Sequence, residues 1–251
     1  MTNKDLQKLT ALARVEWLQR QQSTFLGFLW TMLNPALMFC VLYVIFVKWM
    51  GNKQDDYALF LIVGIVEWNF FSSATSYTLA SLQRRASILN NFPIKPEIPV
   101  LAAVLSSYFS HLLELAALTL LLLVFGRSVN SYWLWIIPLD IICLLLSAGI
   151  GMILAWLFVF YYDLERIWGI ILTAGFFLTP IFYPLSIIEP GRRRLLELNP
   201  MTAIIENLRL AVDGTPPHPA AVLYSGLWAL AAVAAGFIIL RMARSRIGDN
   251  L

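Results

Sequence analysis

Three acidic side chains and one histidine lie inside long apolar segments, and their types could do chemistry. Glu67, Glu114 and Asp140 each interrupt a segment that is otherwise uncharged, and His111 precedes Glu114 by three residues, which can place both on one helix face. An acid at the centre of a spanning helix costs roughly 2.5 to 3.5 kcal/mol on insertion scales, so such residues face protein or water. Two interpretations remain open: a polar translocation lining or proton relay, and structural hydrogen bonding between helices.

Motifs for bond chemistry are missing from the sequence. No glycine is followed by lysine, which excludes the GxxxxGK[ST] phosphate loop, and no GxSxG motif occurs. His111 and His218 lack an HExxH motif and cysteine partners, so we expect neither a metal site nor a cofactor bound by this chain. Cys40 and Cys143 lie in apolar segments, as buried small residues do. The sequence therefore predicts a protein that is not an enzyme.

The elements that must position these residues are membrane-spanning helices. Hydrophobic residues make up 59% of the 251 residues and charged residues only 13%, whereas soluble domains carry about 25% charged residues. Six segments exceed the ~18 apolar residues that suggest a span. They lie between Arg20 and Lys48 and over residues 57–83, 98–126, 128–162, 167–188 and 220–240. Because open strands cannot be satisfied in hydrocarbon, we predict an all-α integral membrane protein with six transmembrane helices in a single domain, 1–251.

The positions of Lys and Arg predict the orientation, since these residues gather in cytoplasmic loops. One side carries basic residues in the N-terminal tail, the second-to-third loop, the fourth-to-fifth loop and the C-terminal tail: Lys4, Lys8, Arg14, Arg20, Arg84, Arg85, Lys95, Arg166, Arg241, Arg244 and Arg246. The cluster Arg192–Arg194 on the other side is an exception. We predict that both termini are cytoplasmic.

Two stretches differ from spans and plain loops. Residues 1–24 read as an N-terminal amphipathic helix, with Leu6, Leu9, Ala13 and Trp17 along one face. Such a helix can lie in the membrane interface or pack on cytoplasmic protein. Residues 186–218 predict a short external helix pair between spans five and six. Its second helix begins after the cap Asn199 and stops at Gly214.

Aromatic residues are abundant, with 9 Trp, 9 Tyr and 16 Phe. Many lie near span ends, where an interfacial belt explains them. Two deeper groups could line a channel and stack on sugar rings: Trp68, Phe70, Phe71 and Tyr77 in the second span, and Phe176, Phe177, Phe182 and Tyr183 in the fifth. Packing against lipid or within the bundle is the alternative for each.

Short motifs in order along the chain carry a family resemblance. The run at 20–30 (RQQSTFLGFLW) followed by Asn34–Pro35 resembles the start of permeases in the type-2 ABC exporter family, in the branch that exports O-antigen, teichoic acid and capsular polysaccharide. Further matches are the G-x-x-x-W-x-F-F feature from Gly64 to Phe71, the loop residues Asn90, Phe92 and Pro93, the loop 163–166, the segment 179–183 and the segment 198–200. The resemblance covers nearly the whole chain.

The resemblance implies partners and roles for particular residues. It implies a homodimer in the bacterial cytoplasmic (inner) membrane, docked on two separate ATP-binding cassette subunits that use ATP and Mg, with a lipid-linked glycan as substrate and no nucleic acid. The loop 84–99 would be the coupling loop, with Arg84, Arg85, Ser87, Asn90, Phe92 and Pro93. Arg20, Ser23, Leu26, Gly27 and Trp30 would form the cytoplasmic gate. Aromatics of spans one, two and five would line the channel. Glu67 departs from the uncharged residue expected there.

Three other readings compete with the glycan permease. The first is a permease of the same exporter family for a drug or lipid. The second is a proton-coupled transporter centred on Glu67, Glu114 or Asp140, which would need no ATPase. The third is a membrane-embedded transferase, which would need paired acids or a histidine near an interface.

Overall fold

A computed structural model describes residues 3–22, 29–51, 56–92 and 94–242 of the chain. Within these ranges the chain is helical and contains no strand, which confirms the predicted all-α class. The elements are α1 (Asn3–Gln22), α2 (Leu29–Tyr43), η1 (Val44–Trp49), α3 (Tyr57–Leu79), α4 (Ser81–Arg84), α5 (Ala86–Asn91), α6 (Glu97–Val124), η2 (Ser131–Trp135), α7 (Ile136–Phe160), α8 (Leu164–Leu178), η3 (Leu185–Ile187), α9 (Pro190–Glu197), α10 (Pro200–Val212) and α11 (Pro219–Met242).

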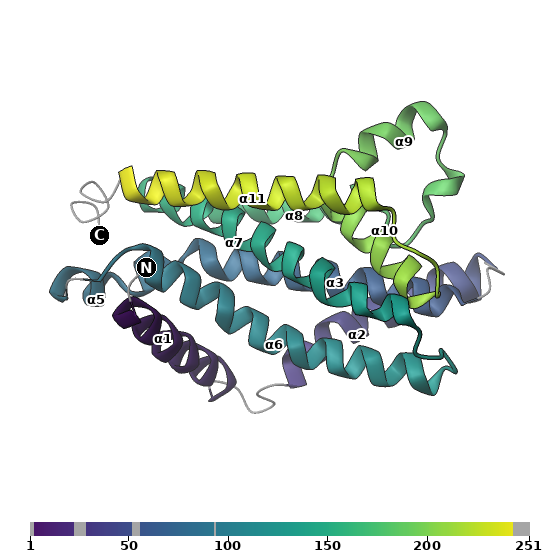
Figure 1. The fold of residues 1–251 in the computed structure, drawn as a ribbon, viewed down its shortest axis with the longest axis horizontal. Helices are drawn as coiled ribbons and strands as arrows, with labels where there is room; N and C mark the ends of the chain where they lie inside the picture. The colour runs from purple at the N-terminus through teal and green to yellow at the C-terminus, as the bar shows by residue number, and fades with distance from the viewer. Residues whose placement is uncertain (1–2, 23–28, 52–55, 93, 243–251) are drawn as a thin grey trace.

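The long helices form a bundle around α3, which packs on both α6 and α7 (Figure 1). Helix α7 packs along α11, where a side chain at Gly149 would overlap the backbone of Ala232 and Val233. A Cβ at Gly151, on another face of α7, would lie 2.7 Å from the Thr78 side chain of α3. Small residues therefore let these helices approach closely, as contacts inside a bilayer require.

Five described helical segments are long and apolar enough to cross a membrane: Thr31–Trp49, Tyr57–Leu79, Glu97–Val124, Ser131–Phe160 and Pro219–Met242. The fifth predicted span, 167–188, overlaps α8, which has 15 residues and ends before Pro180. At 1.5 Å per residue such a helix is only ~22 Å long, whereas the hydrocarbon layer is ~30 Å thick. The count of six spans therefore stays a prediction.

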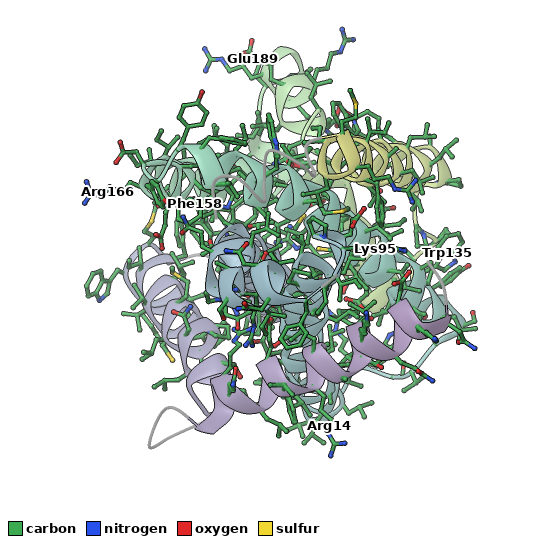
Figure 2. The ribbon with its side chains drawn as sticks, turned by 90° about the vertical axis from the view of Figure 1, so that its left-hand side faces the viewer. Arg14, Lys95, Trp135, Phe158, Arg166 and Glu189 are labelled. Carbon is green, nitrogen blue, oxygen red and sulfur yellow. The ribbon has the colours of Figure 1, made fainter. Side chains whose placement is uncertain are left out.

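The two ends of the bundle differ in what they carry. The N-terminus, α5 and the end of α11 lie together at one end, and α9 and α10 lie at the other (Figure 1). Viewed from the first end, α1 crosses the bundle face, and Arg14 and Arg166 point away from the bundle (Figure 2). Leu9 and Ala13 of α1 are buried against Ile98 of α6. The predicted amphipathic helix exists, and part of its apolar face packs on this chain; Leu6, assigned to that face, is exposed.

The predicted helix pair is formed by α9 and α10. The Asn199 side chain accepts from the backbone N–H of Met201 at 3.0 Å, and Gly214 ends the turn with φ of 77°. The apolar residues of α10 are buried in the main core together with residues of α3 and α7. Helix α10 is therefore inserted into the bundle, whereas α9 projects from it (Figure 1).

Candidate functional site

An aromatic groove runs between α2, α3 and α8 and has a volume of about 570 Å³. Its lining consists of Asn34, Pro35, Met38, Leu42, Ile65, Trp68, Asn69, Ser72, Ser76, Gly169, Leu172, Thr173, Phe176 and Phe177. Three of the predicted channel residues, Trp68, Phe176 and Phe177, are in this lining. Amide and hydroxyl groups lie among the rings, so the groove can offer both apolar stacking and hydrogen bonds.

Ring contacts continue from this groove toward the end of the bundle that carries α9 and α10. Trp68 meets Phe176 edge-on at 6.4 Å between centroids, and Phe176 stacks on Phe182 at 5.8 Å. Phe46 of η1 lies 5.4 Å from Phe182 and 6.3 Å from Tyr57, and the Tyr57 hydroxyl donates to the Phe182 carbonyl at 2.7 Å. We call these five residues the aromatic ladder. It joins rings of η1 and α3 with rings of the segment 176–182, which lies far from both in the sequence.

Glycine at 175 makes room for the ladder. A Cβ there would lie 2.8 Å from Cη2 of the Trp68 indole, closer than real contacts allow. The indole therefore lies over the backbone of α8, where its position is fixed by packing. Tyr183, also a predicted channel residue, adjoins the ladder through Phe182 at 5.1 Å, and its hydroxyl donates to the Phe177 carbonyl.

The other predicted channel residues lie elsewhere. Phe70 is buried and stacks on the imidazole of His111, and Phe71 is buried beside Trp68. Tyr77 lies between two guanidinium groups, with Arg20 4.3 Å and Arg84 3.9 Å from its ring centroid. Position along one span therefore did not show which aromatic rings share a surface.

The predicted coupling loop, 84–99, starts at the last residue of α4, contains α5 and ends within α6. Arg84 donates to the Tyr77 carbonyl at 2.6 Å. Arg85 donates to Glu16 at 3.1 Å and to Gln19 at 3.0 Å on α1. Ser87, Asn90 and Phe92 are exposed, Phe92 at 60%. Pro93 lies outside the described residues. The two arginines are thus engaged within the chain, whereas Ser87, Asn90 and Phe92 present an exposed surface.

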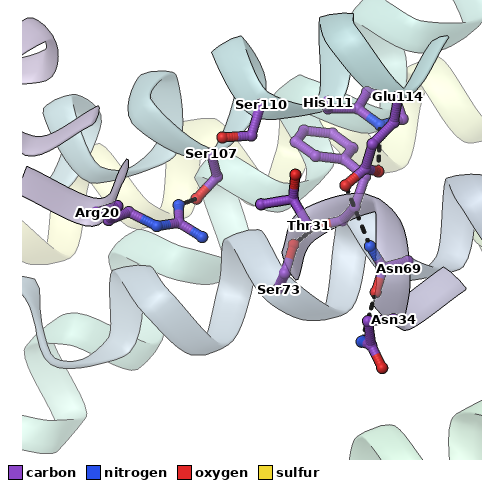
Figure 3. Close-up of a pocket in the computed structure, with 10 residues that line it drawn as sticks. Arg20, Thr31, Asn34, Asn69, Ser73, Ser107, Ser110, His111 and Glu114 are labelled. Carbon is purple, nitrogen blue, oxygen red and sulfur yellow. Dashed lines mark hydrogen bonds and ion pairs between the residues drawn. The ribbon is translucent and has the colours of Figure 1, made fainter. Parts of the chain in front are cut away.

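The predicted gate residues are described only in part. Ser23, Leu26, Gly27 and the side chain of Trp30 lie outside the described residues. Arg20 donates to the Ser107 hydroxyl at 3.0 Å and lines a polar pocket of about 220 Å³ (Figure 3). His111 and Glu114 line the same pocket.

The intramembrane acids, which the sequence placed on three separate segments, lie together in the bundle. Glu67 of α3 and Asp140 of α7 both lie within 4 Å of the imidazole of His111 on α6, and Glu114 faces its other nitrogen. The expectation of no metal site considered only local motifs. The fold brings together ligand types that lie far apart in the chain.

Sequence reasoning also missed the role of Arg209, which is buried at the end of the bundle that carries α9 and α10. Its guanidinium donates to the carbonyls of Phe60 at 3.1 Å, Pro180 at 2.7 Å and Ile181 at 2.7 Å. It also pairs with Glu206 at 2.6 Å. Burial lowers the pKa of Arg209 to about 10, so it stays charged at neutral pH. A lone arginine within the apolar pattern of 201–212 was the available signal.

Gly64, the first residue of the G-x-x-x-W-x-F-F feature, provides the space for this guanidinium. A Cβ at Gly64 would lie 2.6 Å from Nη2 of Arg209 and 3.3 Å from the Ile181 carbonyl oxygen. The small residue and the buried cation therefore belong to one structural unit, which we call the arginine clamp: Gly64, Arg209, Glu206 and the carbonyls of Phe60, Pro180 and Ile181.

Comparison with known proteins identifies the relatives of this chain. The family model described as ABC-2 type transporter matches residues 7–212. The O-antigen export system permease protein RfbA of Myxococcus xanthus is 30% identical over 203 residues, covering 78% of this chain and 76% of that protein. RfbA of Klebsiella pneumoniae is 29% identical over 217 residues, covering 86% and 80%. The polysialic acid transport protein KpsM of Escherichia coli is 25% identical over 193 residues, covering 74% of each.

Proposed function

The chain belongs to the ABC-2 type transporter family, and from this premise we propose that it is the membrane permease subunit of an ATP-driven polysaccharide exporter. The relatives named above are permeases for O-antigen export and a polysialic acid transport protein. No phosphate loop occurs in the sequence, so ATP hydrolysis belongs to a separate ATP-binding cassette subunit. This chain would supply the translocation path for the polysaccharide, and the separate subunit would hydrolyse ATP.

The aromatic groove is the observation that supports a polysaccharide as the cargo. A pyranose ring has an apolar face that packs on an aromatic ring, and its hydroxyls need hydrogen-bond partners. The groove offers Trp68 and Phe176 beside Asn69, Ser72 and Thr173. The aromatic ladder continues this surface, so a glycan can exchange one ring contact for the next without a deep binding minimum. That property suits a polymer in transit better than a small drug or a single lipid.

The end of the bundle with α5 supports the partner assignment. Phe92 is exposed together with the polar residues Ser87 and Asn90, so this loop presents both an apolar and a polar surface to a partner. We propose that this surface docks in the ATP-binding cassette subunit and passes its motion to α3 and α6. The proposal includes two copies of the permease, two ATPase subunits, a lipid-linked glycan, and cytoplasmic termini in the bacterial inner membrane.

The cargo is tested in cells that depend on this permease for surface polysaccharide. Trp68→Ala and Phe176→Ala should each reduce polysaccharide at the cell surface by about tenfold or more, because each removes an aromatic stacking contact. The purified complexes should retain their basal ATP hydrolysis. Trp228→Ala is the matched control, since Trp228 is half exposed on α11 and outside the groove lining.

Full polysaccharide export by both groove variants would contradict the proposal that the groove is part of the export path. Export of a drug or lipid substrate with no polysaccharide defect in the permease deletion would instead favour the drug or lipid alternative. Export that persists without any ATP-binding cassette subunit, driven by a pH gradient, would favour the proton-coupled alternative.

The docking surface needs its own test. Phe92→Asp should abolish co-purification of the ATPase subunit while the permease remains folded, because Phe92 is 60% exposed. Leu195→Asp is the control, as Leu195 is similarly exposed on α9 at the opposite end. Reversing Arg85 would be less informative, since it also breaks the contact with Glu16. Undiminished co-purification of Phe92→Asp would exclude this surface as the ATPase contact.

A further inference from the structure

Four titratable side chains meet inside the bundle, and none of the four belongs to the groove lining or the docking surface. Nε2 of His111 lies 3.1 Å from Oδ1 of Asp140 and 3.7 Å from Oε2 of Glu67. Nδ1 of the same ring lies 3.5 Å from Oε2 of Glu114. All four side chains are buried. We call Glu67, His111, Glu114 and Asp140 the acid–histidine cluster.

The charges of this cluster do not balance. Among the described residues, the ion-pair contacts of all three carboxylates go to the single imidazole of His111. Arg20, which lines the adjoining pocket, donates to Ser107 and interacts electrostatically with Glu114 (Figure 3). Even with the imidazole protonated, three ionised carboxylates leave an excess of negative charge among spanning helices, where charge is expensive. Either bound protons or a bound cation must remove this excess charge.

The hydrogen-bonding capacity of the cluster is only partly used. An imidazole offers at most two N–H groups, and its nitrogens face Asp140 at 3.1 Å and Glu114 at 3.5 Å. Oε1 of Glu67 is buried and has no hydrogen-bond partner among the described residues. Buried polar atoms in proteins are nearly always paired, so the carboxylate left without a ring N–H indicates an occupant. One ligand atom each from Glu67, His111 and Asp140 lies within 4.8 Å of the others.

Neighbouring residues hold the cluster as they hold metal ligands elsewhere. The imidazole stacks on Phe70 with 4.2 Å between centroids and an interplanar angle of 15°. Tyr108 donates to Oδ2 of Asp140, and Asn69 donates to Oε1 of Glu114 at 3.4 Å. A metal-bound histidine characteristically gives its other N–H to a carboxylate, and Glu114 lies at that position.

We propose that Glu67, His111 and Asp140 form a binding site for a divalent transition-metal ion, with zinc the best match. Zinc binds imidazole nitrogen and carboxylate oxygen at 2.0–2.2 Å in a tetrahedron, which sets neighbouring ligand atoms ~3.4 Å apart. The distances of 3.1 and 3.7 Å from Nε2 bracket that value. Magnesium and calcium prefer six or more oxygen ligands, which this set does not provide.

Water can complete the coordination, because the polar pocket lined by His111 and Glu114 adjoins the cluster. The two ligand carboxylates would neutralise the ion, and Glu114 would accept from the imidazole and from Asn69. The ion would join α3, α6 and α7 in the interior of the bundle. The proposed metal site does not depend on the identity of the cargo, because all of its protein ligands come from this chain.

The test measures metal on the full-length chain, purified in detergent, stripped with a chelator and titrated with Zn²⁺. Wild-type protein should bind about one equivalent, and Co²⁺ in its place should give the visible absorption of a four-coordinate site. Glu67→Gln, Asp140→Asn and His111→Gln should each lose this binding. Glu114→Gln keeps all three ligands and should bind ~10–100-fold more weakly.

Glu189→Gln is the matched control, because Glu189 is exposed on the segment before α9 and should leave zinc binding unchanged. If wild-type protein binds no metal, the carboxylates hold protons and the proposal is overturned. Equal binding by wild type and all three ligand variants would overturn it as well, by showing an adventitious surface site. Because the wild-type titration needs no variant, a ligand variant that fails to fold does not prevent this test.

Discussion

The arginine clamp and the acid–histidine cluster are two buried charged regions of one bundle, and they are built in opposite ways. Arg209 finds three backbone carbonyls and one carboxylate, so its guanidinium is almost fully paired. In the cluster, the ion-pair contacts of three carboxylates among the described residues go to one imidazole, which has at most two N–H groups to offer. The clamp is complete within the chain, whereas the cluster requires something from outside it.

The difference shows how buried charge can be assigned a role. A buried ion whose hydrogen bonds are all made holds segments together, and removing it leaves its partners unpaired. A buried ion with unused capacity is costly unless it binds a ligand. In this molecule, a buried charged group is therefore assigned a structural or a ligand-binding role by whether its hydrogen bonds are all made. Burial alone does not distinguish the two roles.

The largest expected effect is at the centre of the clamp. Arg209→Met should destabilise the protein by about 3–5 kcal/mol, because the carbonyls of Pro180 and Ile181 lose their donors and remain buried. Thermal unfolding in detergent measures the change. Arg192→Met, at a side chain that is 82% exposed, serves as the control and should have almost no effect. Equal unfolding temperatures for the two variants would show that the arginine clamp does not stabilise the protein.

In the cluster, the effect of Glu67→Gln on the stability of the protein should change sign when zinc is removed. At zinc concentrations 100 times the dissociation constant, wild-type protein gains ~2.7 kcal/mol that Glu67→Gln cannot gain. After chelation the order reverses, and Glu67→Gln becomes the more stable protein because one excess negative charge is gone. Unfolding temperatures with Zn²⁺ and with chelator measure both states. A Glu67→Gln variant that is less stable in both would indicate a structural acid instead.

A smaller effect tests the space beside the guanidinium. Gly64→Ala should cost about 2 kcal/mol, since the added methyl group meets Nη2 of Arg209 and the Ile181 carbonyl. Gly169→Ala adds the same group to α8 where nothing lies within 4 Å of it, so it should not destabilise. In the Arg209→Met background the cost of Gly64→Ala should shrink. A cost that persists in full would show that the clash is with another group.

The smallest effect separates the carboxylate of the clamp from its carbonyls. Glu206→Gln should cost about 1 kcal/mol, because a neutral oxygen can still accept from Arg209 while the charge assistance is lost. The loss should fade at high salt, as Glu206 is partly exposed. A cost as large as that of Arg209→Met would make the ion pair, and not the three carbonyls, the main support.

Much of the fold could be predicted because a bilayer limits the choices. Long apolar segments between Tyr57 and Leu79 or between Pro219 and Met242 can only be helices, and cap residues such as Asn199 mark where α10 begins. The length of α8 was not predictable in the same way. Apolar residues continue past Pro180, so hydropathy alone does not show that the helix has already ended at Leu178.

The candidate site was predictable only in part, because periodicity fixes a face of one helix but not its neighbour. Trp68 and Phe176 were named from separate spans, and the fold brings them together; Tyr77 was named with them but lies between two arginines. His111 and Asp140 come from different helices, so no spacing rule could pair them. Such contacts depend on the packing of α3, α6 and α7.

The arginine clamp has a consequence for how the chain is made. Phe60 lies 149 residues and Pro180 29 residues before Arg209 in the sequence. When α8 leaves the ribosome, the carbonyls that follow it have no donor, and water must serve them until α10 arrives. We therefore expect the C-terminal end of α8 to pack into the bundle only after residue 209 has been synthesised. Biogenesis at this end would then be a late, concerted step, whereas α3 and α6 can settle as soon as each is complete.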